Sequence, residues 1–265
     1  MVRLIADGRA VSSALARAHG CRLRLVDVGS IGAADGPWPD HVRIARVGDG
    51  TASLAHGPAM SVEAFDAALA IGEAEAESAL AGGARLILTG EMGIGNTTAA
   101  AALISLLTGV SAEAATGRGA GADDSMLRHK TEIVGRAVAR AGPLLARDPR
   151  AAMAAVAGFE IVATAGATLA ATRHGTPVLL DGLVSTAGAL IADRLDPGVR
   201  QRLIASHRSA EPGHAPALTA LGLEPILEWG MRLGEGSGAL VALPLLDSAA
   251  ALLGEVAMLT EVTSP

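Results

Sequence analysis

A short apolar run, a glycine-rich loop and a helical run follow one another near the middle of this chain. Residues 84–88 predict a strand, and the alanine-rich residues 99–107 predict a helix. The loop between them, residues 89–98, has the sequence TGEMGIGNTT. Glycines let a backbone approach an anion closely, and the first turn of a helix offers free N–H donors at its positive end. The loop therefore predicts a phosphate site with the Glu91 carboxylate at its mouth.

The same alternation of apolar runs and helical segments recurs along the chain. Strands alternating with helices predict a parallel sheet, in which ligands lie beyond the carboxyl ends of the strands. We therefore expect an α/β fold, with a Rossmann-like parallel sheet and helices on both faces. The expected strands are 22–28, 41–47, 84–88, 176–182 and 202–206; the expected helices are 1–20, 61–80, 99–107, one from 123 or 124, 149–156, 160–172, 185–192, one after 214, and a long C-terminal helix to about Thr260.

Composition excludes several classes of function. A net charge of −6 and an aromatic content of 2% disfavour a nucleic-acid partner. The single cysteine, Cys21, cannot form an internal disulfide, which fits a reducing compartment. The apolar stretches 97–110 and 161–172 are shorter than the roughly 20 residues of a membrane span, and the charged N-terminus does not resemble a signal peptide. We expect a cytoplasmic protein without a membrane partner.

Commoner glycine-loop sites fit residues 89–98 poorly. A dinucleotide fingerprint needs a small residue where Thr98 stands, and an acidic residue ending a strand about 20 residues on. Glu113 has that spacing, but no strand precedes it. A Walker loop needs Gly-Lys-Ser/Thr, which is absent. His207 and His214 lack a third metal ligand and a nucleophile elbow, so we expect no metal, no cofactor and no hydrolase triad. A tight turn made only for packing remains an alternative.

Five motifs, taken in order, resemble a single family. They are GEMGIGNTT at 90–98, TGRGAGADD at 116–124, DGLVSTA at 181–187, SHRSAEPGH at 206–214 and MRLGEGSGA at 231–239. With them, nearly the whole chain resembles the nicotinate-nucleotide–dimethylbenzimidazole phosphoribosyltransferases of cobalamin lower-ligand synthesis. The resemblance implies a homodimer that transfers 5-phosphoribose from nicotinate mononucleotide to 5,6-dimethylbenzimidazole. The products would be α-ribazole 5′-phosphate and nicotinate.

The residues themselves suit such a transfer. A pyridinium leaving group departs as a neutral ring and needs no general acid, whereas an azole nucleophile must lose its N–H proton to one carboxylate base. Glu235 is the expected base, because it lies between glycines and matches the family's catalytic glutamate. A solvated loop acid or a helix cap is the alternative. Glu91 comes second: it could orient the base or hold ribose hydroxyls, or it could simply accept backbone N–H bonds at a strand end.

Other residues near the glycine motifs are candidates for binding the nucleotide. Lys130 could bring an ammonium to the phosphate, or it could be an exposed helical lysine. Asp181 and Ser185 could contact the ribose or nicotinate, or cap the helix 185–192. Arg208 could pair with the nicotinate carboxylate, although solvent exposure fits it equally well. The full expected set is Glu235 and Glu91 as catalytic residues, and Gly93, Ile94, Gly95, Asn96, Thr97, Gly117, Gly119, Gly121, Lys130, Asp181, Ser185, Ser206, Arg208, Ser209 and Leu233 as substrate-binding residues.

The N-terminus departs from the family pattern. The family has a further N-terminal segment that helps form a small domain and contributes to the benzimidazole pocket, and it usually has Ala-Ile-Asn where residues 11–13 are Val-Ser-Ser. We expect one phosphoribosyltransferase domain over 1–265, with an α/β core over 21–235. Residues 1–20 and 236–265 would form an incomplete helical small domain. A non-catalytic or partner-dependent nucleotide-binding relative, or transfer to another azole, a purine or a phenol, remain alternatives.

Overall fold

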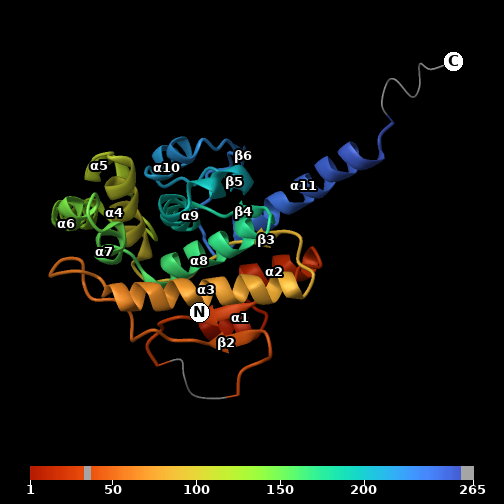
Figure 1. Ribbon diagram of the computed structural model, residues 1–265, viewed down its shortest axis with the longest axis horizontal. Coiled ribbons are helices and arrows are strands. Elements are labelled where there is room, and N and C mark those ends of the chain that lie inside the picture. The colour runs from red at the N-terminus through yellow and green to blue at the C-terminus, as the bar shows by residue number, and fades with distance from the viewer. Residues whose placement is uncertain (33–36, 258–265) are drawn as a thin grey trace.

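The computed structural model describes residues 1–32 and 37–257, so the end of the expected C-terminal helix, near Thr260, lies outside the described residues. The main sheet has four parallel strands in the order β3-β4-β5-β6, and β1 and β2 form a separate parallel pair (Figure 1). The strands are β1 (Leu25–Asp27), β2 (Val42–Ile44), β3 (Ile87–Leu88), β4 (Val178–Leu180), β5 (Leu203–His207) and β6 (Pro225–Leu227).

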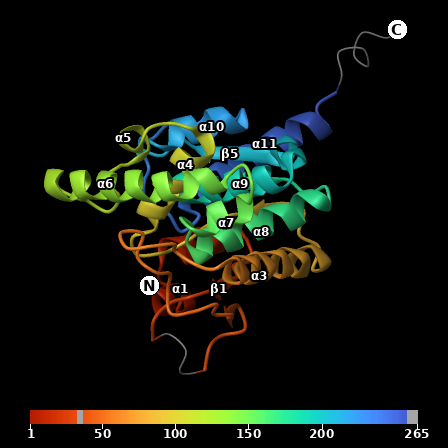
Figure 2. The ribbon, with the colours of Figure 1, turned by 60° about the vertical axis from the view of Figure 1, so that its left-hand side comes forward.

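Helices flank this sheet. α8 and α9 contact β4, and α11 packs against β5. The pair β1–β2 lies with α1 on the side of α3 that faces away from the main sheet (Figure 1, Figure 2). The helices are α1 (Val2–Ala6), α2 (Val11–Ala18), α3 (Val62–Ala81), α4 (Asn96–Thr108), α5 (Ala112–Ala115), α6 (Asp124–Ala141), α7 (Pro149–Ala154), α8 (Phe159–Arg173), α9 (Leu183–Leu195), α10 (His214–Leu221) and α11 (Ser237–Glu255), with 3-10 turns at Gly142–Leu144 and Pro197–Arg202.

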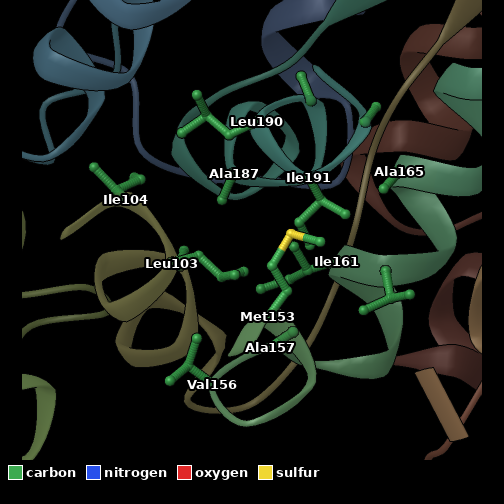
Figure 3. Close-up of a cluster of buried hydrophobic side chains, with 14 of the residues drawn as sticks. Leu103, Ile104, Met153, Val156, Ala157, Ile161, Ala165, Ala187, Leu190 and Ile191 are labelled. Carbon is green, nitrogen blue, oxygen red and sulfur yellow. The ribbon is translucent and has the colours of Figure 1, made fainter. Parts of the chain in front are cut away.

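Small aliphatic side chains build the core, as the composition requires. Helices α4, α7, α8 and α9 meet around Met153, with Leu103, Ile161 and Ile191 beside it (Figure 3). Helices α3 and α8 pack closely because both carry glycines at their contact. A Cβ on Gly72 would overlap the Ala163 carbonyl, so only glycine allows the two backbones this approach.

The α/β fold with a parallel sheet flanked by helices is confirmed, and several helix starts are where capping residues predict them. The Ser61 hydroxyl caps α3, and Asp123 and Asp148 cap α6 and α7. The expected single helix over 1–20 is wrong: it is two helices, because the chain turns at Gly8 with φ 72°. Strand β6 is not among the expected strands, because it is three residues long and begins with Pro225 at the sheet edge.

Helix α11 extends away from the body of the molecule, and only its first turns are buried (Figure 1, Figure 2). Within residues 1–32 and 37–257 it is the one helix long and apolar enough to cross a membrane on length and composition alone. It is thus a longer apolar stretch than residues 97–110 and 161–172, which are too short for a span. A single helix of this kind is weak evidence for a membrane.

Candidate active site

Four loops meet at the carboxyl edge of the main sheet. Glu91 follows β3, Asp181 follows β4, His207 ends β5, and the loop after β6 carries Glu235. Because the strands are parallel, all four loops leave the same edge, where ligands of such sheets bind. The first and last loops touch: a Cβ on Gly90 would lie 2.6 Å from the Gly236 nitrogen.

The backbone at Glu235 is held in an unusual conformation. Its φ is 61°, and it is the one non-glycine residue with a positive φ among the described residues. The residue's N–H donates to the Glu91 carbonyl oxygen at 3.0 Å. Left-handed backbone costs a residue with a Cβ about 1–2 kcal/mol, so the surrounding contacts must impose it. The direction in which the carboxylate leaves the loop is therefore fixed.

Asp181 supplies much of that constraint. Its side chain is buried, and Oδ2 accepts the Gly236 N–H at 3.1 Å. Its Oδ1 accepts the N–H groups of Gly238 at 2.7 Å and Ala239 at 3.3 Å. From sequence, Asp181 is expected to contact the nucleotide or to cap the following helix. The structure places its carboxylate on the start of α11 and not on α9, whose N-cap Gly182 has no side-chain cap; His207 Nε2 lies 3.6 Å away.

Glu91 lies in a cluster of carboxyl groups. Burial, followed by the neighbouring Glu160 and Asp181 carboxylates, raises the pKa of Glu91 to about 8, with a smaller contribution from Glu235. A hydrogen bond from Asn96 Nδ2 to Glu91 opposes this rise. The Glu91 carboxyl group is consequently mostly protonated at neutral pH, so it can donate a hydrogen bond but is a poor proton acceptor there.

The first glycine loop leads into α4 without a side-chain cap. Gly95, with φ 80°, is the N-cap residue of α4, and no side-chain hydrogen bond caps the helix in the described part of the chain. Gly93 packs against Glu160, whose Oε1 would lie 2.9 Å from an added Cβ. Ile94 is fully exposed. The start of α4 is therefore presented to solvent, as an anion site requires.

The second glycine loop is tied to the first. Lys130 Nζ donates to the Gly117 carbonyl at 2.8 Å and to Thr97 Oγ1 at 3.2 Å. Burial lowers the pKa of the Lys130 ammonium, and the nearby Glu211 carboxylate opposes this effect. Glu211 Oε1 also accepts the Gly119 N–H at 2.9 Å. Sequence reasoning missed Glu211, although it lies in the fourth family-like motif, because a loop carboxylate gives no local sign of its distant partner.

The remaining candidates differ in how they are placed. Ser185 is buried and its hydroxyl lacks a hydrogen-bond partner among the described residues, whereas Ser206 Oγ donates to the Asp181 carbonyl at 3.4 Å. Arg208 pairs with exposed Glu228 at 2.8 Å. Three other candidates complete the set: Ser209 is buried, Leu233 is about half exposed, and Gly121 adopts φ 117° in the second glycine loop.

Both ring nitrogens of His214 have hydrogen-bond partners within the protein. His214 Nδ1 accepts the Ser209 N–H at 2.7 Å, and Nε2 lies 2.9 Å from Thr186 Oγ1. Burial, then His207, lowers the pKa of His214 to about 3, so the ring is neutral. No group of three or more His, Cys, Asp or Glu side chains suited to a metal occurs within 1–32 and 37–257.

Ser12 connects the beginning of the chain to this edge. Ser12, in α2, donates both its N–H and its hydroxyl to Glu235 Oε2. In the sequence, residues 11–13 stand out only as a departure from the family pattern. Nothing local to Ser12 indicates a partner 223 positions away.

Comparisons with known proteins identify the family of this chain. A family model described as phosphoribosyltransferase matches residues 1–263. The nicotinate-nucleotide–dimethylbenzimidazole phosphoribosyltransferase of Pseudomonas putida KT2440 is 47% identical over 98% of this chain and 74% of its own length, and that of Thermus thermophilus is 46% identical over 96% and 74%. The crystal structure of CobT from Thermus thermophilus covers 100% of this chain and 78% of its own, with a TM-score of 0.95 and 44% identity. This chain belongs to the phosphoribosyltransferase family.

Proposed function

We propose that this protein transfers 5-phosphoribose from nicotinate mononucleotide to 5,6-dimethylbenzimidazole, giving α-ribazole 5′-phosphate and nicotinate, in cobalamin biosynthesis. The observation that carries the proposal is the placement of Glu235. Its carboxylate stands on a constrained loop at the carboxyl edge of the sheet, beside the first glycine loop. The choice of substrates follows the names of the relatives reported above.

In this reaction the free nitrogen of the azole attacks C1′ of the ribose. The bond from C1′ to the nicotinate nitrogen breaks, and its electron pair stays on the pyridine ring. The other azole nitrogen then loses its proton to Glu235, which acts as the general base. The protonated Glu91 is a hydrogen-bond donor beside the base. The protein's main task is to orient two rings about one carbon.

The nucleotide phosphate would bind at the start of α4. Gly93, Gly95 and Thr97 would offer backbone N–H groups there, whereas the Asn96 N–H already donates to the Gly93 carbonyl at 3.4 Å. Asn96 would line the site, and Lys130 would add an ammonium through its contact with Thr97. Within the proposal, Gly117, Gly119 and Gly121 shape the second wall of this site. Asp181 acts as an anchor of the Glu235 loop, and Ser185, Ser206, Arg208, Ser209, Ile94 and Leu233 complete the surrounding edge.

The direct test is nicotinate release from nicotinate mononucleotide in the presence of 5,6-dimethylbenzimidazole. We expect E235Q to lower the rate by about 10²–10⁴-fold, because general-base catalysis contributes that much, and to leave nucleotide affinity unchanged by calorimetry. The matched control is E224Q, which removes an exposed carboxylate between α10 and β6.

Each outcome separates one alternative. Nucleotide binding without release would favour a non-catalytic or partner-dependent relative. Nicotinate release in the presence of a purine or a phenol, but not of the benzimidazole, would assign a different acceptor to the protein. A near-normal rate for E235Q would remove Glu235 as the base.

We further propose a cytoplasmic homodimer. Helix α11 supports this assembly, because Leu245, Leu252 and Leu253 are exposed on the part that extends from the body (Figure 1). A second copy could cover these side chains, which would otherwise face water. Sedimentation of a monomer at high protein concentration would contradict the dimer.

A further inference from the structure

Ser12 contacts the proposed base from an unexpected direction. It is the second residue of α2 and is only 3% exposed. Its backbone N–H and its hydroxyl each lie 3.3 Å from Glu235 Oε2. Oε1 makes no hydrogen bond within the described residues. One carboxylate oxygen is thus held, and the other is left to accept a proton.

The start of α2 is suited to hold an anion. Its N-cap residue, Ala10, offers no side-chain cap, so the first N–H groups of the helix need an outside acceptor. The Glu235 carboxylate supplies that acceptor at the positive end of the helix. The Ser12 hydroxyl then adds a second donor to the same oxygen. Two donors from one residue fix the position of this oxygen better than either would alone.

The loop around Glu235 is therefore held from two sides. On the backbone side, the Glu91 carbonyl accepts the Glu235 N–H, and Asp181 accepts the Gly236 N–H. On the side-chain side, the described contacts to the carboxylate come from Ser12. The backbone contacts place Cα of the base, and the Ser12 contacts place Oε2 of its carboxylate.

We propose that Ser12 is a positioning residue for the transfer, holding the Glu235 carboxylate in the orientation that accepts the azole proton. The proposal rests on the function proposed above for Glu235. It differs from a purely structural role, in which Ser12 would only tie α2 to the rest of the fold.

The neighbouring serine provides a matched control. Ser13 is 4% exposed, and its hydroxyl donates to the Ile5 carbonyl at 2.9 Å. Its hydroxyl makes no hydrogen bond to Glu235 among the described contacts. S12A and S13A therefore each remove one buried hydroxyl from the same helix, but only S12A changes what holds the base.

The decisive experiment combines S12A with E235D. We expect S12A to lower kcat about tenfold, the value of a hydrogen bond to a charged group, while KM for nicotinate mononucleotide changes less than about twofold. E235D draws the carboxylate back by one methylene, out of reach of Ser12. In that background S12A should therefore change kcat less than about twofold. S13A should leave kcat near that of the unmodified protein and combine multiplicatively with E235D.

Two results would overturn the proposal: an unchanged kcat in S12A, or the same tenfold loss in the E235D background. Urea unfolding of S12A, E235A and the double variant tests the contact without catalysis. S12A should lower the urea midpoint of unfolding when Glu235 is present and leave the midpoint unchanged in the E235A background. Equal decreases in the two backgrounds would contradict the contact. If the unmodified protein released no nicotinate, the reaction would fail, and the unfolding series would still decide whether Ser12 holds the carboxylate.

Discussion

Two helices start at the same edge of the sheet with nearly the same local design. Helix α4 follows Gly95 with φ 80°, and α11 follows Gly236 with φ 75°. Neither N-cap residue contributes a side-chain cap. At α11, however, Asp181 accepts three backbone N–H groups, whereas the described residues supply no such cap to α4.

The difference teaches that a glycine-led helix start is not by itself an anion site. The local sequence decides that N–H groups are presented, and a residue from another strand decides whether they are free. Under the proposed function the two helix starts have different roles. The open start of α4 receives the phosphate, while the filled start of α11 fixes the loop that carries the base.

The largest expected effect comes from weakening the hydrogen bonds between Asp181 and the start of α11. Asn in D181N keeps one acceptor oxygen, but its NH₂ group opposes the N–H donors that Asp181 now satisfies. We expect the unfolding free energy to fall by about 2–4 kcal/mol and kcat to fall at least tenfold. Urea unfolding and nicotinate release measure the two effects. A stable variant with full activity would show that the α11 start needs no anchor.

A smaller effect should follow from changing the start of α4. An added methyl group at Gly95 meets nothing within 4 Å, so G95A acts through its positive φ and costs about 1–2 kcal/mol of strain. We expect the affinity for nicotinate mononucleotide to fall about tenfold, with kcat at saturation nearly unchanged. Calorimetry measures the affinity, and initial rates at saturating substrate measure kcat.

Gly222 is the control for that substitution. It has φ 69° and equally open surroundings, but it ends α10 rather than starting α4. G222A should lose similar stability without losing nucleotide affinity. Equal losses of affinity in both variants would mean that strain, and not the α4 start, weakens binding.

The last expected effect is the pH dependence of stability due to Glu91. Its pKa is about 8 in the folded protein and near the ordinary 4.5 when unfolded, so the folded state binds more protons between these values. The contribution of Glu91 to stability therefore falls as pH rises from about 5 to 8. Across this range we expect Tm to decrease a few degrees more in the unmodified protein than in E91Q. Thermal melts at pH 5.5 and 8.5 measure this, and equal slopes in the two proteins would contradict it.

Local signals explain which features could be predicted from sequence. Ser61 and Asp123 precede helices and cap them, and the loop after β3 carries its glycines where a strand passes into a helix. The residues that were missed or misplaced act over long distances. Ser12 and Glu211 bond to backbone or side-chain groups 223 and 92 positions away, and no periodicity or spacing records such a partner. Asp181 is a candidate from sequence, but its partner is α11 rather than the next helix.

The contact between Ser12 and Glu235 also bears on the synthesis and folding of the protein. The two residues are separated by 223 positions, so a ribosome makes one long before the other. Closing so large a loop costs conformational entropy that only the assembled sheet and helices can repay. A partly synthesised chain that ends before Glu235 already contains the sequence of the α4 loop but has no proton acceptor. In refolding, recovery of turnover should consequently trail recovery of helical signal, which makes activity a reporter of the last long-range contact to form.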